Sequence, residues 1–136
     1  MGLYDVTEHE IAVIGWAGPT APAHPRFPRS QGLNGAAVAS RRSVMVQDVS
    51  QDGRYLPTLG DTRGEMIMPV SGSNGSIVGT IDVESAVVNA FSDRDQALLE
   101  EFARALLPLW KPPARDDHPT TTSGDSEPSG ARPGRP

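Results

Sequence analysis

Large apolar side chains recur every three or four positions in the segment that ends at Trp110. They are Leu98, Leu99, Phe102, Leu106 and Leu109. This spacing places them along one face of a helix. Ser92 and Asp95 precede the pattern at the separation of a capping box, and Pro108 bends or ends the last turn. The sequence therefore predicts a helix over residues 92–110.

Four other segments are rich in β-branched residues and are bounded by turn residues, which predicts strands. They cover residues 10–18, 43–49, 65–70 and 76–85. Residues 19–32 contain too many prolines for a strand ladder, whereas the alanine-rich residues 33–42 favour a short helix. This order of elements predicts an α+β domain with a central antiparallel sheet.

Two carboxylates stand two positions apart in the strand predicted at 76–85. Because strand side chains alternate, one face carries Val78, Thr80, Asp82 and Glu84. The other face carries Ile77, Gly79, Ile81 and Val83. The second face is apolar and belongs to the core, so the environment of the first face decides what the acids do.

The turn before this strand sets the position of a third acid. Asn74-Gly75 predicts a two-residue type I′ turn that pairs Ser73 with Ser76, and this register places Glu65 opposite Glu84 and Ile67 opposite Asp82. Glu65, Asp82 and Glu84 would then cluster on one face. Such a cluster requires compensation by a cation, by Arg54 or Arg63, or by water. The alternative is a solvated strand end with its acids pointing outward.

Composition limits the class of protein and its partners. The net charge is −5 with a pI near 5.1, and no basic run exceeds Arg41-Arg42, which argues against a nucleic-acid or acidic-membrane partner. The absence of cysteine excludes disulfides, thiolate metal sites and cysteine nucleophiles. No apolar run is long enough to span a bilayer, and the N-terminus of this sequence lacks the basic and apolar regions of a secretory signal. We therefore expect a cytoplasmic protein.

Residues 111–136 differ in composition from the rest of the chain. They hold six of the 13 prolines and no aromatic or large aliphatic residue. Such a segment buries too little apolar surface to offset the entropy lost on ordering. We expect a folded domain over residues 1–110 and a disordered tail over residues 111–136.

Three stretches of the chain read FPRSQGLNGAAVASRRSVMVQDVSQDGRY, GEMIMPV and GSIVGTIDVESAVVNAFSDRDQALLEEFA. They resemble GAF domains, and most closely the branch that contains the free methionine-R-sulfoxide reductases. The resemblance covers residues 3–110 and implies a GAF-like antiparallel sheet with helices on one face, a loop-covered pocket on the other, and an N-terminally shortened first strand. In the reductases, acids at the positions of Glu65, Asp82 and Glu84 line the substrate pocket. The resemblance thus implies a sensor domain for a small polar metabolite such as a free amino acid.

The three cysteines of the reductases would fall on His24, Asn34 and Thr58 of this chain, so none is kept. Reduction of a sulfoxide needs an attacking thiolate and a resolving thiol. We therefore expect no catalytic residue and no reductase activity, unless a partner supplies thiols. A third hypothesis is an interaction module without a ligand, whose apolar face along Leu98, Phe102 and Leu109 stays uncovered.

Further ligand-binding candidates flank the acids. Backbone N–H groups at Leu33, Asn34 and Gly35 could bind a small anion or a carboxylate at a helix start, as in the GAF nitrate receptors that this stretch resembles. Trp16 and Tyr55 could supply aromatic walls, with core packing as the alternative for Trp16. Residues 54–63, which include Thr58, could form a lid.

The three histidines are scattered along the chain and show no metal-ligand spacing, so we expect no metal and no cofactor. The ligand would be a free amino acid or a small anion. Because the sequence contains no output domain, a second copy of the chain or a separate signalling protein would be the protein partner.

Overall fold

The computed structural model describes residues 1–57 and 60–110. The predicted tail at 111–136 and the candidate Thr58 lie outside the described residues and stay predictions. Within the described part, no helix has the length and apolar character needed to cross a membrane.

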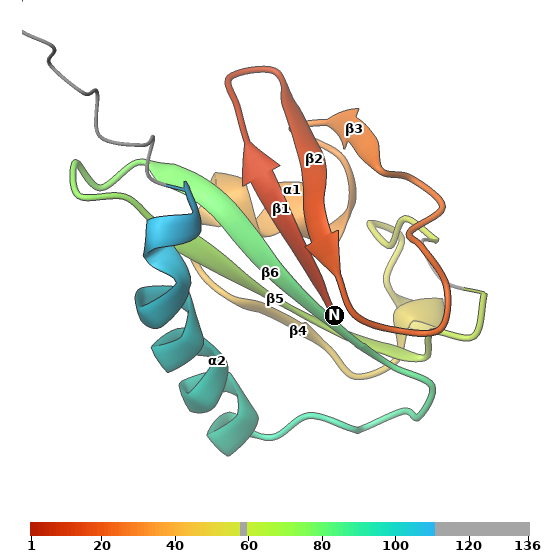
Figure 1. Cartoon of the computed structure of the whole chain (residues 1–136). Helices are drawn as coiled ribbons and strands as arrows, with labels where there is room; N and C mark the ends of the chain where they lie inside the picture. Colours follow the sequence, from red (N-terminus) through yellow and green to blue (C-terminus); the bar gives the residue numbers. More distant parts are fainter. Residues whose placement is uncertain (58–59, 111–136) are drawn as a thin grey trace, which may run out of the picture.

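A six-stranded antiparallel sheet forms the centre of the molecule, with the strands in the spatial order β3-β2-β1-β6-β5-β4 (Figure 1). The two long strands β5 and β6 pair along their whole length at its middle. This confirms the predicted α+β class. In chain order the elements are β1 (Gly2–Val6), β2 (Glu10–Trp16), β3 (Arg26–Pro28), α1 (Gly32–Ser40), β4 (Val44–Val46), η1 (Val49–Gln51), β5 (Gly64–Ser71), β6 (Ile77–Ser85), α2 (Asp93–Leu106) and η2 (Leu107–Trp110).

The two α-helices cover opposite faces of the sheet, so the expectation of helices on a single face is wrong. Leu99 and Ala103 of α2 pack on Met66 and Met68 of β5. Leu33 and Ala37 of α1 pack with Ile67, which lies between Met66 and Met68 in β5. Because successive strand residues point to opposite faces, α1 and α2 must lie on opposite sides. Each helix therefore contacts the β5 and β6 side chains that point to its own face of the sheet.

The predicted C-terminal helix is confirmed, together with its cap. Ser92 Oγ accepts from the Asp95 N–H, and the Asp95 carboxylate accepts from the Ser92 N–H at 2.8 Å, which completes the capping box. The α-helix ends at Leu106, and Pro108 lies in the 3₁₀ turn η2 that follows. This turn carries the chain to Trp110, which packs against the sheet.

The local sequence patterns predicted neither β3 nor β1. The expectation that proline excludes a ladder in residues 19–32 is wrong, because β3 is a three-residue strand at the edge of the sheet, where an unused backbone donor costs nothing. Only the resemblance implied β1, as a shortened first strand; it pairs with both β2 and β6 near the middle of the sheet. Its five residues are too few for a clear periodic pattern.

The β5–β6 turn differs from the predicted one, yet the predicted pairing of the acids is correct. The Gly75 N–H donates to the Gly72 carbonyl at 2.9 Å and Gly75 has φ +80°, so the loop holds three residues rather than two. Ser71 pairs with Ile77 and Val70 with Gly79, which makes Val78 a bulge residue. The longer loop shifts the register by one residue and the bulge restores it, so Glu65 still lies opposite Glu84.

The bulge also reverses the side chains that precede it. Ile77 was expected to share a face with Ile81, but it packs with Tyr4 and Val38 on the α1 side. Val78 was expected beside the acids, but it packs in the cluster beneath α2. Only Thr80, Asp82 and Glu84 of the predicted polar face keep their place.

Candidate functional site

Three carboxylates meet in the middle of the sheet, on the face that α1 covers. Glu65 comes from β5, and Asp82 and Glu84 come from β6; one oxygen of each lies within 4.8 Å of the others. Glu65 is only 3% exposed and Asp82 only 2%. The alternative of a solvated strand end is therefore wrong for these two acids.

Neutral side chains hold the outer oxygens of the cluster. Asn34 in the first turn of α1 donates from Nδ2 to Asp82 Oδ2 at 3.1 Å, and its own Oδ1 accepts from the Thr80 hydroxyl at 2.5 Å. The Thr62 hydroxyl donates to Glu84 Oε2 at 3.2 Å. These bonds fix the orientation of two carboxylates without neutralising their charge.

No Arg or His side chain of residues 1–57 and 60–110 forms an ion pair with Glu65 or Asp82. Arg54, expected to compensate the acids, instead pairs with Asp52 at 2.7 Å. Arg63, the other candidate, is also absent from these ion pairs. Because buried carboxylates are stable only when paired or protonated, the cluster requires a proton or a bound cation.

Burial raises the pKa of Glu65 far above its usual range, and the charges of Asp82 and Glu84 and a hydrogen bond with Asp82 raise it further. Burial and the charge of Glu84 also raise the pKa of Asp82, opposed by hydrogen bonds from Asn34 and Glu65 and by the positive charge of the N-terminus. With both acids ionised, Glu65 Oε2 and Asp82 Oδ1 have no donor. A proton on Glu65 that is shared with Asp82 satisfies both atoms.

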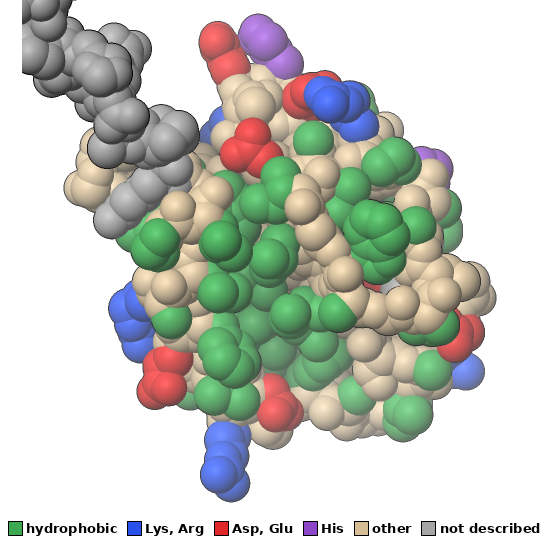
Figure 2. Space-filling view, viewed as in Figure 1, with side chains coloured by type: hydrophobic (Ala, Val, Ile, Leu, Met, Phe, Trp, Pro, Cys, Tyr) green, Lys and Arg blue, Asp and Glu red, His purple; other side chains and the backbone are tan. Residues whose placement is uncertain are grey.

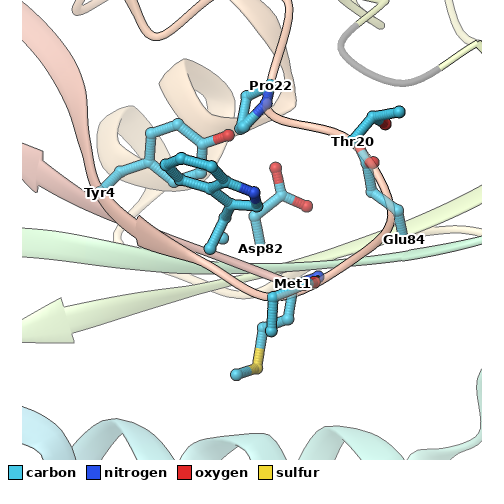
Figure 3. Close-up of a pocket in the computed structure, with 9 residues that line it drawn as sticks. Met1, Tyr4, Thr20, Pro22, Asp82 and Glu84 are labelled. Atoms are coloured by element: carbon cyan, nitrogen blue, oxygen red, sulfur yellow. The ribbon is translucent and has the colours of Figure 1, made fainter.

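A small cavity of about 20 Å³ opens beside the acids and is lined by Asp82 and Glu84. Figure 3 shows both side chains pointing from β6 into a space bounded by Tyr4 of β1 and by Thr20 and Pro22 of the loop after β2. This volume admits about one water molecule. Burial, followed by the charges of Asp82, Glu84 and Glu65, raises the pKa of Tyr4 above its usual range.

The sequence predictions missed Tyr4, Thr20 and Pro22 as cavity residues. Apolar residues alternate at Tyr4 and Val6 just before a turn, and this pattern could have indicated β1. The loop over the cavity comes from residues 17–22, whereas the predicted lid was residues 54–63. Proline-rich composition argued against a strand there but carried no signal for a cavity wall.

The other predicted ligand-binding residues separate into groups. Trp16 lines the cavity and is 54% exposed, so core packing of this side chain is wrong. Asn34 touches the cluster through Asp82, whereas Leu33 is buried in the core beneath α1. Gly35 and Tyr55 line a different hollow. The Gly35 N–H donates to the Gln31 carbonyl within the first helical turn, so it is not available to an anion.

The opposite face of the sheet carries an apolar groove of about 380 Å³ between α2 and the strands. Met66, Val83, Phe91, Leu98 and Phe102 line it, and Figure 2 shows apolar side chains gathered over this region. Leu98, Phe102 and Leu109 are each about half exposed. The expectation that these three side chains stay uncovered is confirmed for the described residues.

The family model of the GAF domain matches residues 1–106. The chain belongs to the GAF domain family. GAF domains are in general small-molecule-binding regulatory domains. The resemblance inferred from the sequence is thereby confirmed.

Individual relatives include a bacterial protein and two free methionine-R-sulfoxide reductases. Protein YtsP of Bacillus subtilis (strain 168) is 28% identical over 105 residues, covering 77% of this chain and 64% of that protein. The type II free methionine-R-sulfoxide reductase of Thermoplasma acidophilum superposes with a TM-score of 0.74 at 29% identity, covering 79% of this chain and 75% of the other. The substrate complex of the reductase from Neisseria meningitidis gives a TM-score of 0.73 at 28% identity, covering 80% and 65%.

The chain spans slightly less than two thirds of the curated relatives YtsP and GAF domain-containing protein A of Dictyostelium discoideum. Its 136 residues include no cysteine. The structure describes two of the three positions that the resemblance matches to reductase cysteines. Asn34 is a buried link between α1 and Asp82, and His24 is exposed.

Proposed function

We propose that this GAF domain is a sensor for a small metabolite that presents a cationic group to Glu65, Asp82 and Glu84. The observation that carries the proposal is the burial of Glu65 and Asp82 without a positively charged side-chain partner among residues 1–57 and 60–110. An ammonium group would replace the shared proton and donate to the two unpaired oxygens. A free amino acid fits this chemistry, whereas a small anion such as nitrate would be repelled.

Ligand entry on this proposal requires the loop at residues 17–25 to move. The closed cavity of about 20 Å³ has room for about one water molecule, so an amino acid cannot enter it unchanged. Trp16 and Pro22 form part of the wall and Trp16 is half exposed. Outward movement of this loop would expose Asp82 and Glu84 without disturbing the sheet.

A thermal-shift titration of the full chain tests the proposal, with free methionine, methionine sulfoxide, other amino acids and nitrate as probes. A compound that binds only the folded state stabilises it by about 2.7 kcal/mol at a hundredfold excess over Kd. We expect an amino acid to raise the melting temperature and nitrate to leave it unchanged.

The variant Asp82→Asn should abolish that rise, and Glu101→Gln on the exposed surface of α2 should keep it. A rise with nitrate, or an undiminished rise in Asp82→Asn, would refute the proposed cation recognition. Reductase activity is not part of the proposal, because the chain supplies no thiolate.

A second candidate function is self-association through the apolar groove beside α2. The groove and the half-exposed Leu98, Phe102 and Leu109 favour it. A second copy is the occupant we propose, because residues 111–136 of the same chain contain no aromatic or large aliphatic side chain to fill the groove. Light scattering should give twice the monomer mass for the wild type and the monomer mass for Phe102→Ser; a monomeric wild type contradicts it.

A further inference from the structure

Trp110 lies against the sheet on the α2 face, on the side opposite the acid cavity. Its ring occupies the space above Gly79 of β6, where a Cβ would overlap Nε1 and Cε2 of the indole. The α2 end reaches the sheet beside β6 (Figure 1). Only glycine at position 79 lets the indole approach the backbone this closely.

The indole also makes a specific polar contact with the neighbouring strand. Trp110 Nε1 donates to the backbone carbonyl of Tyr4 at 2.9 Å. The ladder between β1 and β2 is irregular at this point, since Leu3 pairs with Gly15 but Tyr4 pairs with Val13. A bulge interrupts the regular hydrogen bonding of a ladder, so a side-chain donor has a place here.

Tyr4 belongs to both faces of the sheet through its two parts. Its carbonyl bonds Trp110, while its ring is 2% exposed and lines the cavity with Asp82 and Glu84. The ring packs edge-on against Phe27 with centroids 5.9 Å apart. A movement of β1 at Tyr4 therefore changes both the cavity wall and the contact of Trp110 with the Tyr4 carbonyl.

We propose that Trp110 is a positioning residue for the ligand cavity: it holds Tyr4 from the far face and so couples the cavity to the C-terminal end of the helical segment. The regulatory part of this inference rests on the proposed function, because it requires a ligand in the cavity. A ligand that displaces the Tyr4 ring shifts the contact between Trp110 and the Tyr4 carbonyl. By linkage, loss of this contact lowers the affinity for the ligand by the same factor by which the ligand weakens the contact. The signal leaves the domain at the residue where the chain continues to 111–136.

Fluorine NMR of the full chain labelled with 3-fluorotyrosine tests this coupling without any ligand. The sequence contains only two tyrosines, Tyr4 and Tyr55, and Tyr55→Phe assigns the two resonances. Trp110→Phe keeps an aromatic ring but removes the N–H donor. We expect it to shift the Tyr4 resonance across the sheet and to leave the Tyr55 resonance in place.

Two further variants make the result decisive. Gly79→Ala leaves Trp110 intact but places a methyl group where the indole ring lies, so it should shift the Tyr4 resonance in the same way. Leu109→Ala changes a neighbouring half-exposed residue and should shift neither tyrosine resonance. An unmoved Tyr4 resonance in Trp110→Phe would overturn the inference, as would equal shifts in Leu109→Ala. If Gly79→Ala does not fold, Trp110→Phe alone decides.

The coupling experiment and the ligand titration fail independently. The fluorine shift needs no bound compound, so its absence would refute the role of Trp110 and leave ligand binding untouched. Conversely, a titration in which no compound binds would refute the proposed sensor while the positioning of Tyr4 by Trp110 could still be measured.

Discussion

The two faces of the central sheet are built from alternate residues of the same strands, yet they obey different physical rules. Ile81 and Asp82 are neighbours in β6 and are 0% and 2% exposed. Ile81 packs with Met66 and Leu99 beneath α2. Asp82 meets Glu65 and Glu84 on the α1 side. Both faces bury apolar clusters, and the α1 face also buries carboxylates at nearly the same depth.

Burial stabilises the apolar side chains and destabilises the ionised carboxylates. Removing apolar surface from water is favourable, whereas a buried carboxylate without a counter-charge is unfavourable. The hydrogen bonds from Asn34 and Thr62 reduce this cost, but no Arg or His side chain in the described part of the chain forms an ion pair with Glu65 or Asp82. Sites where a fold departs from its own stabilising rules are expected to be functional, and this contrast is the reason for proposing the carboxylate cluster as the binding site.

The largest expected effect separates the two faces by single substitutions at adjacent positions. Ile81→Ala removes a fully buried side chain from the α2 face and should lower the free energy of unfolding by about 2–5 kcal/mol. Asp82→Asn keeps an oxygen that can accept from Asn34 but removes a buried charge. We expect it to leave the free energy of unfolding unchanged or to raise it, measured by urea unfolding at neutral pH.

The opposite ranking would break the comparison. If Asp82→Asn costs as much as Ile81→Ala, the carboxylate stabilises the sheet and its burial no longer indicates a ligand. Leu99→Ala provides a control on the α2 face, because this side chain is also buried in the cluster that contains Ile81. It should fall within the same range as Ile81→Ala.

Local patterns predicted the elements whose signals are strong and periodic. The capping box at Ser92 and Asp95 and the spacing of the apolar residues after it predicted α2 correctly. The pairing of Glu65 with Glu84 was also correct, but for a partly wrong reason. A three-residue loop and a bulge at Val78 offset each other, and neither has a signature that alternation alone reveals.

The cavity could be predicted only in part because its wall comes from distant segments. The acids share one hairpin, so strand alternation and a turn sufficed to group them. Tyr4 and Trp16 reach them through the pairing of β1 with β6 and β2, which no local pattern specifies. Arg54 shows the reverse error, because a nearby carboxylate, Asp52, takes the cation that the cluster was expected to use.

The smallest expected effect, for a change of one pH unit, is a slope in stability against pH that the buried carboxylates should produce. The pKa of Glu65 is raised by burial first, then by the charges of Asp82 and Glu84 and the shared hydrogen bond, with a last contribution from Asp52. Between the unfolded value near 4.3 and the raised folded value, the folded chain keeps a proton that the unfolded chain has lost. The unfolded state then binds fewer protons, so the free energy of unfolding falls as pH rises.

The stabilisation from this proton is fully present below the unfolded pKa of Glu65. It decreases as the pH rises through neutral, by at most about 1.4 kcal/mol per pH unit for one proton. Urea unfolding between about pH 5 and about pH 8, a range in which this linkage acts, should show the decline in the wild type and a flatter profile in Glu65→Gln. Glu101→Gln, an exposed carboxylate on α2, serves as the control and should keep the wild-type slope. A Glu65→Gln profile as steep as the wild type would mean that Glu65 is ionised in the folded chain, and a cation would then have to be sought among the groups around it.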